Sequence, residues 1–430
     1  MRIAVIGSGI AGNGAAYALA TGSDHEIAVY EKARRPGGHS ATVDIEYDGQ
    51  EISVDTGFIV YNEPNYPNLT ALFRELNVAT QASDMGLSVS IDGGRREWAA
   101  RDYGVMTGFL ARRRNAVSPR FWVMIKEILR FNRLAPLDRA KGAMRGRTLR
   151  QYLTERRFGD AMVEDYLKPI GAAIWSMAPC RVLDFPAESF VSFFENHHLL
   201  KWSRPIWRTV TGGSRRYVEA MTRPFADRLR LGGSAVRVER GLDAVFVTAS
   251  DGHTELFDAA ILAAHSDETL ALLGDASGDE REILSAIRYS PNRVFLHRDE
   301  RLMPQRKAAW SAWNVLDWGG DDEIAVTYWM NALQGIDRRR PLFVSLNPPF
   351  EPRPLLTFAS FTYHHPQYDA AALAAQRRLP EIQGRARLWF CGAWTGYGFH
   401  EDGLVSGLEA AEHLGARLSW RSAARQVAAE

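Results

Sequence analysis

The sequence predicts an α/β fold that begins with a Rossmann-like unit. Residues 2–6 have the composition of a short buried strand, and residues 7–12 read Gly-Ser-Gly-Ile-Ala-Gly. Residues 13–20 are small and suit a helix, and residues 27–30 form a second apolar strand that ends at Glu31. Strand, glycine turn, helix, strand and acidic residue follow in the order of a dinucleotide-binding unit. A glycine turn alone is weak evidence for such a unit, but here every flanking element is present.

Each residue of this turn has a physical role. Gly7 permits the tight turn, Gly9 lets the backbone approach a pyrophosphate, and Gly12 lets helix and strand pack closely. Ile10 and Ala11 open the helix, whose free N–H groups and positive dipole end favour phosphate. Glu31 would accept hydrogen bonds from a ribose diol and would repel a 2′-phosphate, which disfavours NADP.

Length and composition limit the number of domains and the class of protein. At about 150 residues per domain, 430 residues predict two or three domains. The net charge of +1 argues against a nucleic-acid binder. The two cysteines, Cys180 and Cys391, cannot form a disulfide framework or a thiolate zinc cluster, and we expect a cytoplasmic protein. Residues 3–23 carry no charge but are too rich in glycine for a membrane span or signal peptide.

The residues after Glu31 point to FAD. Arg35, Gly37 and Gly38 follow it in a spacing that resembles the ExxxRxGG signature of the flavin-containing amine oxidase and phytoene desaturase superfamily. A guanidinium can pair with a phosphate, and paired glycines let backbone amides approach it; a solvated basic turn is the alternative. The resemblance assigns further FAD contacts to Lys32, His39, Asp55, Thr56, Gly57, Val236, Gly392, Trp394, Gly403 and Leu404.

The end of the chain resembles the superfamily as well. Residues 388–392 predict a strand, residues 393–402 an aromatic and glycine-rich loop, and residues 403–413 a helix whose N-terminus would face the flavin ring. The resemblance implies a discontinuous Rossmann-like FAD-binding domain and an amine-oxidase-like α+β substrate domain. We expect the first at 1–85, 205–285 and 385–425, and the second at 86–204 and 286–384.

A narrower resemblance concerns the substrate. Residues 169–176 and 394–403 look like a bacterial branch of NAD/FAD-binding oxidoreductases associated with cyclopropane and methyl-branched fatty-acid synthesis. It implies desaturation, or double-bond reduction, of a fatty acyl or phospholipid substrate, and a lipid methyltransferase as partner. It does not choose between the two directions.

A basic segment gives independent support for a lipid. Eleven basic residues and two acidic ones lie between Leu110 and Thr148, with Phe121, Trp122 and Phe131 among apolar residues at helical spacing. One interpretation is a helix at 110–148 that faces the inner membrane surface, which would make the protein peripheral. The other is a core-packed helix with a solvated basic face.

The sequence offers several residues for chemistry. His400 and Glu401 precede the predicted flavin-facing helix and are acid/base candidates, although Glu401 could instead cap that helix or anchor the loop. Tyr397 could shape the flavin face. An amine oxidase is the second hypothesis, with Lys168 as its candidate lysine. A flavin-binding partner subunit of a lipid methyltransferase is the third.

Other aromatic and histidine residues leave alternatives open. Those at 197–208, including the pair His197 and His198, could line a tunnel mouth; their spacing does not support a metal site. Trp310, Trp313, Tyr328 and Trp329 could line a cavity or belong to the core.

Overall fold

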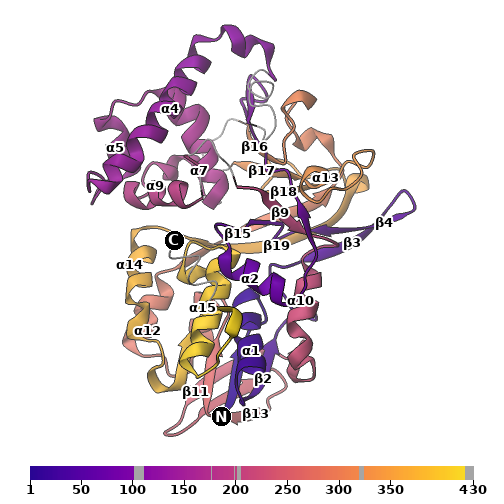
Figure 1. Cartoon of the computed structure of the whole chain (residues 1–430), viewed down its shortest axis with the longest axis vertical. Helices are drawn as coiled ribbons and strands as arrows, with labels where there is room; N and C mark the ends of the chain where they lie inside the picture. Colours follow the sequence, from indigo (N-terminus) through magenta and orange to yellow (C-terminus); the bar gives the residue numbers. More distant parts are fainter. Residues whose placement is uncertain (101–110, 176, 198, 201–204, 319–323, 422–430) are drawn as a thin grey trace.

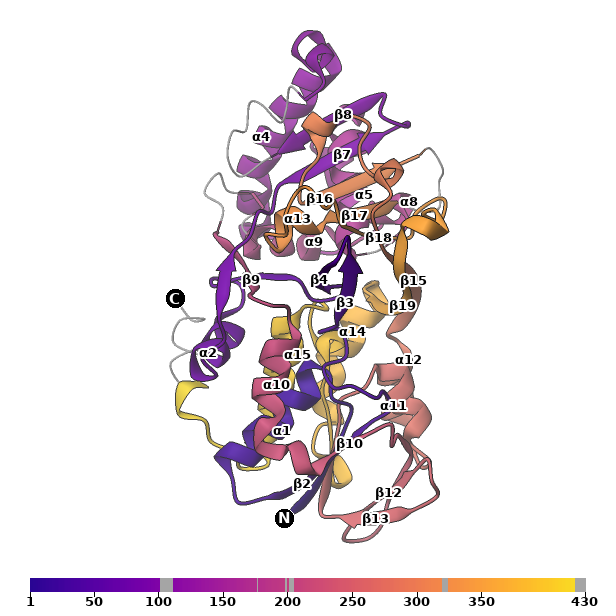
Figure 2. The same cartoon turned by 90° about the vertical axis from the view of Figure 1, so that its right-hand side faces the viewer.

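The computed structural model describes residues 1–100, 111–175, 177–197, 199–200, 205–318 and 324–421. The molecule is elongated, with a Rossmann-like domain at one end and a second domain of sheet and helices at the other (Figure 1). Both domains are built from segments far apart in the sequence, as the colour changes within each show (Figure 2).

A parallel sheet forms the centre of the Rossmann-like domain. Its order is β10 (Leu229–Leu231), β2 (Glu26–Glu31), β1 (Arg2–Ile6), β14 (Ala259–Leu262) and β20 (Leu388–Phe390). Strands β1, β2, β14 and β20 are largely buried apolar runs, as expected for a parallel sheet covered on both faces, whereas the edge strand β10 is partly exposed. The N-terminal, middle and C-terminal segments of the chain thus meet in one sheet.

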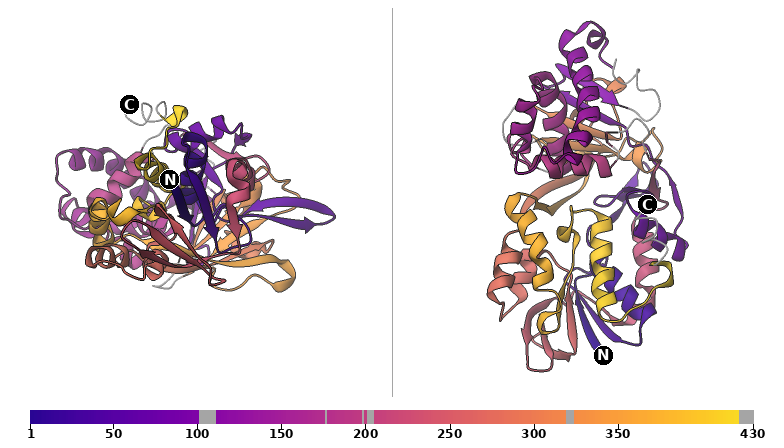
Figure 3. Two further views of the ribbon diagram at one scale, coloured as in Figure 1. Left: turned by 90° about the horizontal axis from the view of Figure 1, so that it is seen from below. Right: turned by 60° about the vertical axis from the view of Figure 1, so that its left-hand side comes forward.

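Helices cover one face of this sheet. They are α1 (Ile10–Gly22), α15 (His400–His413) and α10 (Arg215–Thr222), and α1 and α15 pack side by side (Figure 3). A Cβ atom on Gly407 would lie 2.0 Å from the carbonyl oxygen of Ala11, so this close helix pair depends on glycine. Next to α15 lies the short helix α2 (Pro67–Glu75).

The other face carries an antiparallel sheet and three helices. These elements are β11 (Ala235–Arg240), β12 (Val245–Ala249), β13 (Thr254–Phe257), α11 (Ser266–Leu272), α12 (Gly278–Ser285) and α14 (Ala370–Arg378). Ala372, Ala375 and Ile382 pack in the same core as Ala4 and Ala260 of the central sheet. The predicted boundary at 384/385 is therefore wrong in detail, because α14 covers the Rossmann-like sheet.

A mixed seven-stranded sheet forms the second domain. Its order is β19 (Thr357–Gln367), β15 (Arg288–His297), β18 (Phe343–Leu346), β17 (Ala325–Trp329), β16 (Trp313–Asp317), β7 (Leu87–Ile91) and β8 (Arg96–Ala100). Only β16 and β7 run parallel within it. The long strands β15 and β19 extend towards the Rossmann-like domain (Figure 2).

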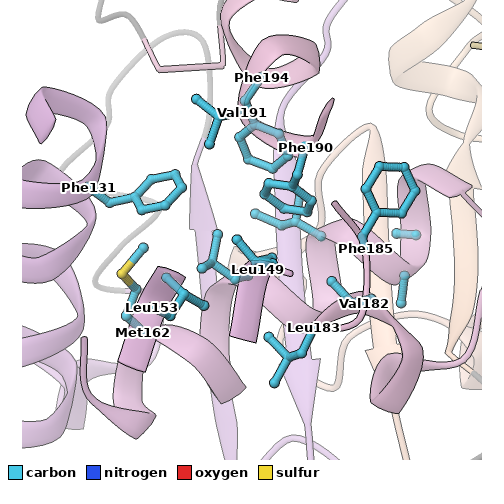
Figure 4. Close-up of a cluster of buried hydrophobic side chains, with 14 of the residues drawn as sticks. Phe131, Leu149, Leu153, Met162, Val182, Leu183, Phe185, Phe190, Val191 and Phe194 are labelled. Carbon is cyan, nitrogen blue, oxygen red and sulfur yellow. The ribbon is translucent and has the colours of Figure 1, made fainter. Parts of the chain in front are cut away.

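A helical layer packs against this sheet. It contains α4 (Pro119–Ala140), α5 (Leu149–Glu155), α6 (Asp160–Met162), α7 (Lys168–Trp175), α8 (Pro179–Val182) and α9 (Ala187–Asn196). Phe131, Phe190 and Phe194 are fully buried between these helices (Figure 4). Because they are buried, truncating one of these phenylalanines to alanine should lower the free energy of unfolding by about 3–5 kcal/mol.

Shorter strands join the domains. The hairpin β3 (Thr42–Tyr47) and β4 (Gln50–Asp55) pairs only with itself, and β9 (Trp207–Val210) pairs with β5 (Val60–Asn62) and β6 (Thr80–Ala82). The hairpin packs against the second domain's sheet, with Ile45 and Val54 in one cluster with Val294 and Leu296. Residues 42–55 were assigned to the Rossmann-like domain, but their apolar face belongs to its neighbour. The remaining helix, α13 (Met330–Leu333), follows β17.

The predicted fold class is confirmed: an α/β Rossmann-like domain is combined with an additional β domain. Two details differ. The sequence suggested a continuous apolar strand pattern over residues 257–264, but it breaks at Asp258 into the end of β13 and β14, and α15 begins at His400 rather than at Gly403. Within the described ranges, no helix is both long and apolar enough to cross a membrane.

Candidate functional site

One cavity of about 1030 Å³ runs from the glycine turn of the Rossmann-like domain to the helical layer of the second domain. Fourteen of the predicted site residues line it: Gly7, Gly9, Ile10, Ala11, Glu31, Lys32, Gly38, His39, Thr56, Gly57, Val236, Gly392, Trp394 and His400. Residues from both ends of the chain thus meet around one space. The other seven predicted site residues do not line it.

The glycine turn forms a cradle at one end of the cavity. Gly7 has φ of +102°, and a Cβ atom there would lie 2.9 Å from the carbonyl oxygen of Ala263. A Cβ atom on Gly9 would meet nothing within 4 Å, so this residue faces open space. The first backbone bond into α1 runs from Asn13 N–H to the Gly9 carbonyl, 2.8 Å. The earlier N–H groups of Ile10 and Ala11 have no partner among the described residues and are free for an anion.

Gly12 is a packing residue and does not line the cavity. A Cβ atom there would lie 1.9 Å from the Gly7 carbonyl oxygen, which no rearrangement of side chains could relieve. The prediction that Gly12 lets helix and strand pack closely therefore agrees with the geometry. Its assignment as a direct cofactor contact does not.

Glu31 lies at the end of β2 beside this cradle. Its carboxylate accepts hydrogen bonds from Ser8 N–H at 2.9 Å, Ser8 Oγ at 2.7 Å and Ala33 N–H at 2.8 Å. These bonds fix the carboxylate at the cavity wall. Lys32 forms an ion pair with Glu268 on the same wall.

Arg35 does not occupy the position that its motif predicted. Its guanidinium donates to the carbonyl oxygens of Gly38, at 3.1 Å, and of Ser40, at 3.3 Å, and it does not line the cavity. Its role in this structure is to close its own loop. The loop presents Gly38, with φ of +55°, and His39 to the cavity.

Asp55 is another structural residue. It is fully buried and accepts hydrogen bonds from Ser214 N–H at 2.9 Å and from Thr42 Oγ1 at 2.6 Å. Its neighbours Thr56 and Gly57 do reach the cavity, and a Cβ atom on Gly57 would lie 2.1 Å from the His39 carbonyl oxygen. Asp55 therefore positions this turn from behind.

The C-terminal loop closes the same wall. Gly392 and Trp394 line the cavity, and Trp394 Nε1 donates to the Ala264 carbonyl at 3.1 Å. Gly403 and Leu404 do not line it. They lie in the second turn of α15 and pack on α1, where a Cβ on Gly14 would lie 2.9 Å from Leu404 Cδ1.

Of the three predicted catalytic residues, only His400 lines the cavity. Its ring stacks on Phe58, with centroids 3.8 Å apart, and its Nε2 lies 2.7 Å from Tyr217 OH. Burial lowers the pKa of His400 to about 3, so its imidazole is neutral. Tyr397 lies outside the cavity and packs edge-on against Phe193.

Glu401 is a tether. Its carboxylate accepts hydrogen bonds from the N–H groups of Asn68, at 2.8 Å, and Leu69, at 3.0 Å, at the start of α2. Burial raises its pKa. The anchoring alternative is the one the geometry supports, and Glu401 as acid or base facing the cavity is wrong. The neighbouring Asp402 folds the loop, accepting from Tyr397 N–H and Phe399 N–H; burial raises its pKa to about 6.

The sequence missed a group of histidines and tyrosines on the cavity wall. His39 lies 5.0 Å from Tyr363, 5.7 Å from His365 and 6.2 Å from His265, measured between ring centroids. Burial, together with the neighbouring histidines, lowers the pKa of His39 to about 3 and that of His365 to about 4. No local sequence pattern predicts this group. His365 comes from β19 and His265 from the segment before α11, both far along the chain from His39.

One atom of this group is unsatisfied. Nε2 of His39 is buried and has no hydrogen-bond partner among the described residues. A buried polar nitrogen without a partner costs about 1–3 kcal/mol. His39 itself lines the cavity.

The far half of the cavity is apolar and aromatic. Its walls come from α7, α9 and the seven-stranded sheet: Leu87, Trp98, Ile170, Ala173, Ile174, Phe193, Phe194, Trp313 and Tyr328. Among the described lining residues, the only Asp, Glu, Lys or Arg are Glu31, Lys32 and Glu268, all at the Rossmann-like end. The second half is therefore suited to a hydrocarbon group.

The remaining predicted residues divide between wall and core. Trp313 and Tyr328 line the cavity, whereas Trp310 and Trp329 pack with Phe343 in a separate cluster. His197 and Trp207 also line it; His198, Trp202 and Arg204 lie outside the described residues. Lys168 pairs with Glu164 at 2.6 Å and does not line it. In the described part of the chain, no three His, Cys, Asp or Glu residues are grouped to hold a metal ion.

This chain resembles known proteins in part of its sequence and in its fold. The NAD(P)-binding Rossmann-like domain family matches residues 5–76. Wild-type putrescine oxidase bound to putrescine has a similar structure over 97% of this chain and 100% of its own, at 15% identity and a TM-score of 0.67. The fold is amine-oxidase-like.

Other solved structures share this amine-oxidase-like fold. A fatty acid isomerase from P. acnes, which produces CLA, matches over 96% of this chain and 98% of its own, at 14% identity and a TM-score of 0.65. Cyclohexylamine oxidase from Brevibacterium oxydans IH-35A matches over the same shares, at 15% identity and a TM-score of 0.65. No curated protein matches the sequence. At these identities the likeness concerns the fold alone.

The residues of the cradle fit a dinucleotide. Open space at Gly9 and free N–H groups at the start of α1 suit a pyrophosphate, and the fixed carboxylate of Glu31 suits a ribose. Val236 stands half-exposed on the adjoining β11. His39, whose Nε2 has no partner among the described residues, also lines this cavity.

Proposed function

We propose that this protein is an FAD-dependent oxidoreductase that acts on carbon–carbon bonds of unsaturated or methyl-branched acyl chains of membrane lipids. The observation that supports this most is the division of the cavity: a dinucleotide cradle lies at one end, and at the other lies an apolar half with no Asp, Glu, Lys or Arg among its described lining residues. An acyl chain has no charge to satisfy and gains free energy by leaving water.

The chain offers contacts for each part of FAD. The N–H groups of Ile10 and Ala11 would bind the pyrophosphate, Glu31 the adenosine ribose and Val236 the adenine. The walls made by Gly57, Gly392 and Trp394 would hold the ring system. When bound, FAD supplies the exchange of a hydride with the substrate.

The protein's own task is to manage one proton and to exclude water. Desaturation removes a hydride and a proton from adjacent carbons and leaves a double bond; reduction adds both. His39 is our choice for the residue that holds this proton at Nε2, because that atom lacks a partner among the described residues and His39 lines the cavity. The apolar side chains of α7 and α9 exclude water from the reacting carbons.

An amine oxidase is the alternative that the fold itself raises. Putrescine oxidase and cyclohexylamine oxidase share this architecture. The apolar half of the cavity argues against a cationic amine, because no described carboxylate lines it to pair with an ammonium group. Lys168, the lysine that this hypothesis named, is held by Glu164 away from the cavity.

Anaerobic spectroscopy of the FAD-loaded protein tests the proposal. The oxidised protein is mixed with saturated acyl phospholipids, and the photoreduced protein with unsaturated ones; a panel of amines is run beside them. We expect the flavin spectrum to change with one lipid class and with no amine. A response to amines alone would make the protein an amine oxidase. If no lipid or amine acts unless a lipid methyltransferase is added, the protein is instead a flavin-binding partner of that enzyme.

A further inference from the structure

The outward face of α4 carries large apolar residues that the fold does not bury. The exposed fractions are 47% for Trp122, 48% for Val123, 44% for Leu129 and 52% for Leu137. At 100° per residue these four positions lie within a stripe about 120° wide. The opposite side of the helix, with Phe121, Met124 and Phe131, is buried in the core.

Only basic residues share this stripe with the apolar ones. Lys126 and Arg133 are exposed within it, and Lys141 follows at the C-terminal end. None of the three forms an ion pair with any residue that the structure describes. The two acidic residues of α4 point elsewhere: Glu127 accepts from Gly159 N–H at 3.0 Å, and Asp138 is buried beside Tyr152.

Helix α4 lies at the edge of the second domain and next to a helix that lines the cavity. The helix forms an outer edge of the second domain (Figure 1). It packs on α9, to which the ion pair between Arg139 and Glu195 ties it. Because α9 supplies Phe193 and Phe194 to the cavity, whatever docks on α4 lies one helix away from the apolar half of the site.

We propose that this face of α4 is the surface by which the protein docks on an anionic phospholipid bilayer. Trp122, Leu129 and Leu137 enter the boundary between headgroups and acyl chains, while Lys126, Arg133 and Lys141 contact the phosphates. A protein partner would need acidic residues to match these cations, and the described part of this chain shows no complementary acidic face on α4 itself for self-association. The inference does not depend on flavin chemistry.

Vesicle co-sedimentation tests this docking with the full-length protein. We expect binding to vesicles of phosphatidylcholine with phosphatidylglycerol, little binding to phosphatidylcholine alone, and weaker binding as salt rises. The double variants Lys126→Glu/Arg133→Glu and Trp122→Ser/Leu129→Ser should each weaken binding at least about tenfold. Both variants should fold, because all four side chains are exposed, although Trp122→Ser also removes the hydrogen bond from Trp122 Nε1 to the Ala116 carbonyl.

Matched controls lie on the Rossmann-like domain. Arg223→Glu/Arg281→Glu changes two exposed arginines, and Leu242→Ser/Leu256→Ser changes two exposed leucines. Both should bind vesicles like the wild type. The proposal is overturned if the wild type stays in the supernatant with anionic vesicles, if either α4 variant binds unchanged, or if the controls lose binding to the same degree.

Discussion

The two halves of the cavity are built in different ways. The dinucleotide half is made largely by backbone, in short contiguous segments where glycines bring chain against chain. The apolar half is made by side chains from α7, α9, β7, β16 and β17, which are far apart in the sequence. Recognition through backbone leaves a pattern in the sequence, whereas recognition through a shared apolar wall looks like any other core.

Glycine substitutions give the largest expected effects in the dinucleotide half. Gly12→Ala places a Cβ atom 1.9 Å from a carbonyl oxygen and should destabilise the fold by at least about 3 kcal/mol. Gly9→Val enters open space, so the protein should fold but retain no FAD. Thermal melting and flavin content after purification separate the two. A Gly9→Val protein that keeps its flavin would show that the cradle is not where the pyrophosphate binds.

His39 lies where the two halves meet. His39→Ala should slow flavin reduction or reoxidation by lipid on the order of 10²-fold, the usual contribution of a proton-transfer residue. His297→Ala is the control, since His297 is a buried histidine that does not line the cavity. Stopped-flow traces at equal flavin loading make the comparison. Equal rates for His39→Ala and the wild type would remove His39 from the chemistry.

The same histidine gives a pH effect on stability. Its pKa is about 3 in the folded protein and about 6.5 when unfolded, so the unfolded chain binds more protons between these values. Stability therefore falls as pH drops through this window, by up to about 1.4 kcal/mol per pH unit for this group. His39→Ala should show a shallower decline in denaturant melts between pH 6.5 and 4.5. An identical slope would mean that His39 is not buried in its neutral form.

The apolar half can be altered without touching the cradle. Ala173 lies on α7 and lines the cavity. Ala173→Phe should fill part of that space and lower the response to phospholipid at least about tenfold, while FAD content stays unchanged. Ala161→Phe, in the same helical core but away from the cavity, controls for overpacking. Loss of FAD in Ala173→Phe would contradict the separation of the two halves.

The smallest effect is expected at Glu401. Glu401→Gln keeps one acceptor oxygen for the N–H groups of α2, so it should cost about 1–3 kcal/mol of stability and leave the rate of flavin turnover unchanged. Calorimetric melting and turnover by lipid measure the two quantities. A slowed rate with unchanged stability would restore Glu401 as an acid or base.

The same contrast explains what the sequence could predict. Gly7, Gly9 and Glu31 were identified because a cradle needs those residue types at those spacings. Arg35 and Asp55 belong to equally visible motifs, but their side chains stabilise loops, and sequence spacing cannot tell a ligand contact from a loop contact. His39 was predicted only as an FAD contact that the family resemblance implies, with no role in proton transfer. Its group with His265 and His365 arises from tertiary pairing and could not be predicted.

Calorimetric titration of the flavin-free protein with FAD tests the central claim most directly, with NADP as the comparison. We expect one FAD per chain and no bound NADP, because the carboxylate of Glu31 would repel a 2′-phosphate. Failure to take up FAD, or equal binding of NADP, would contradict it.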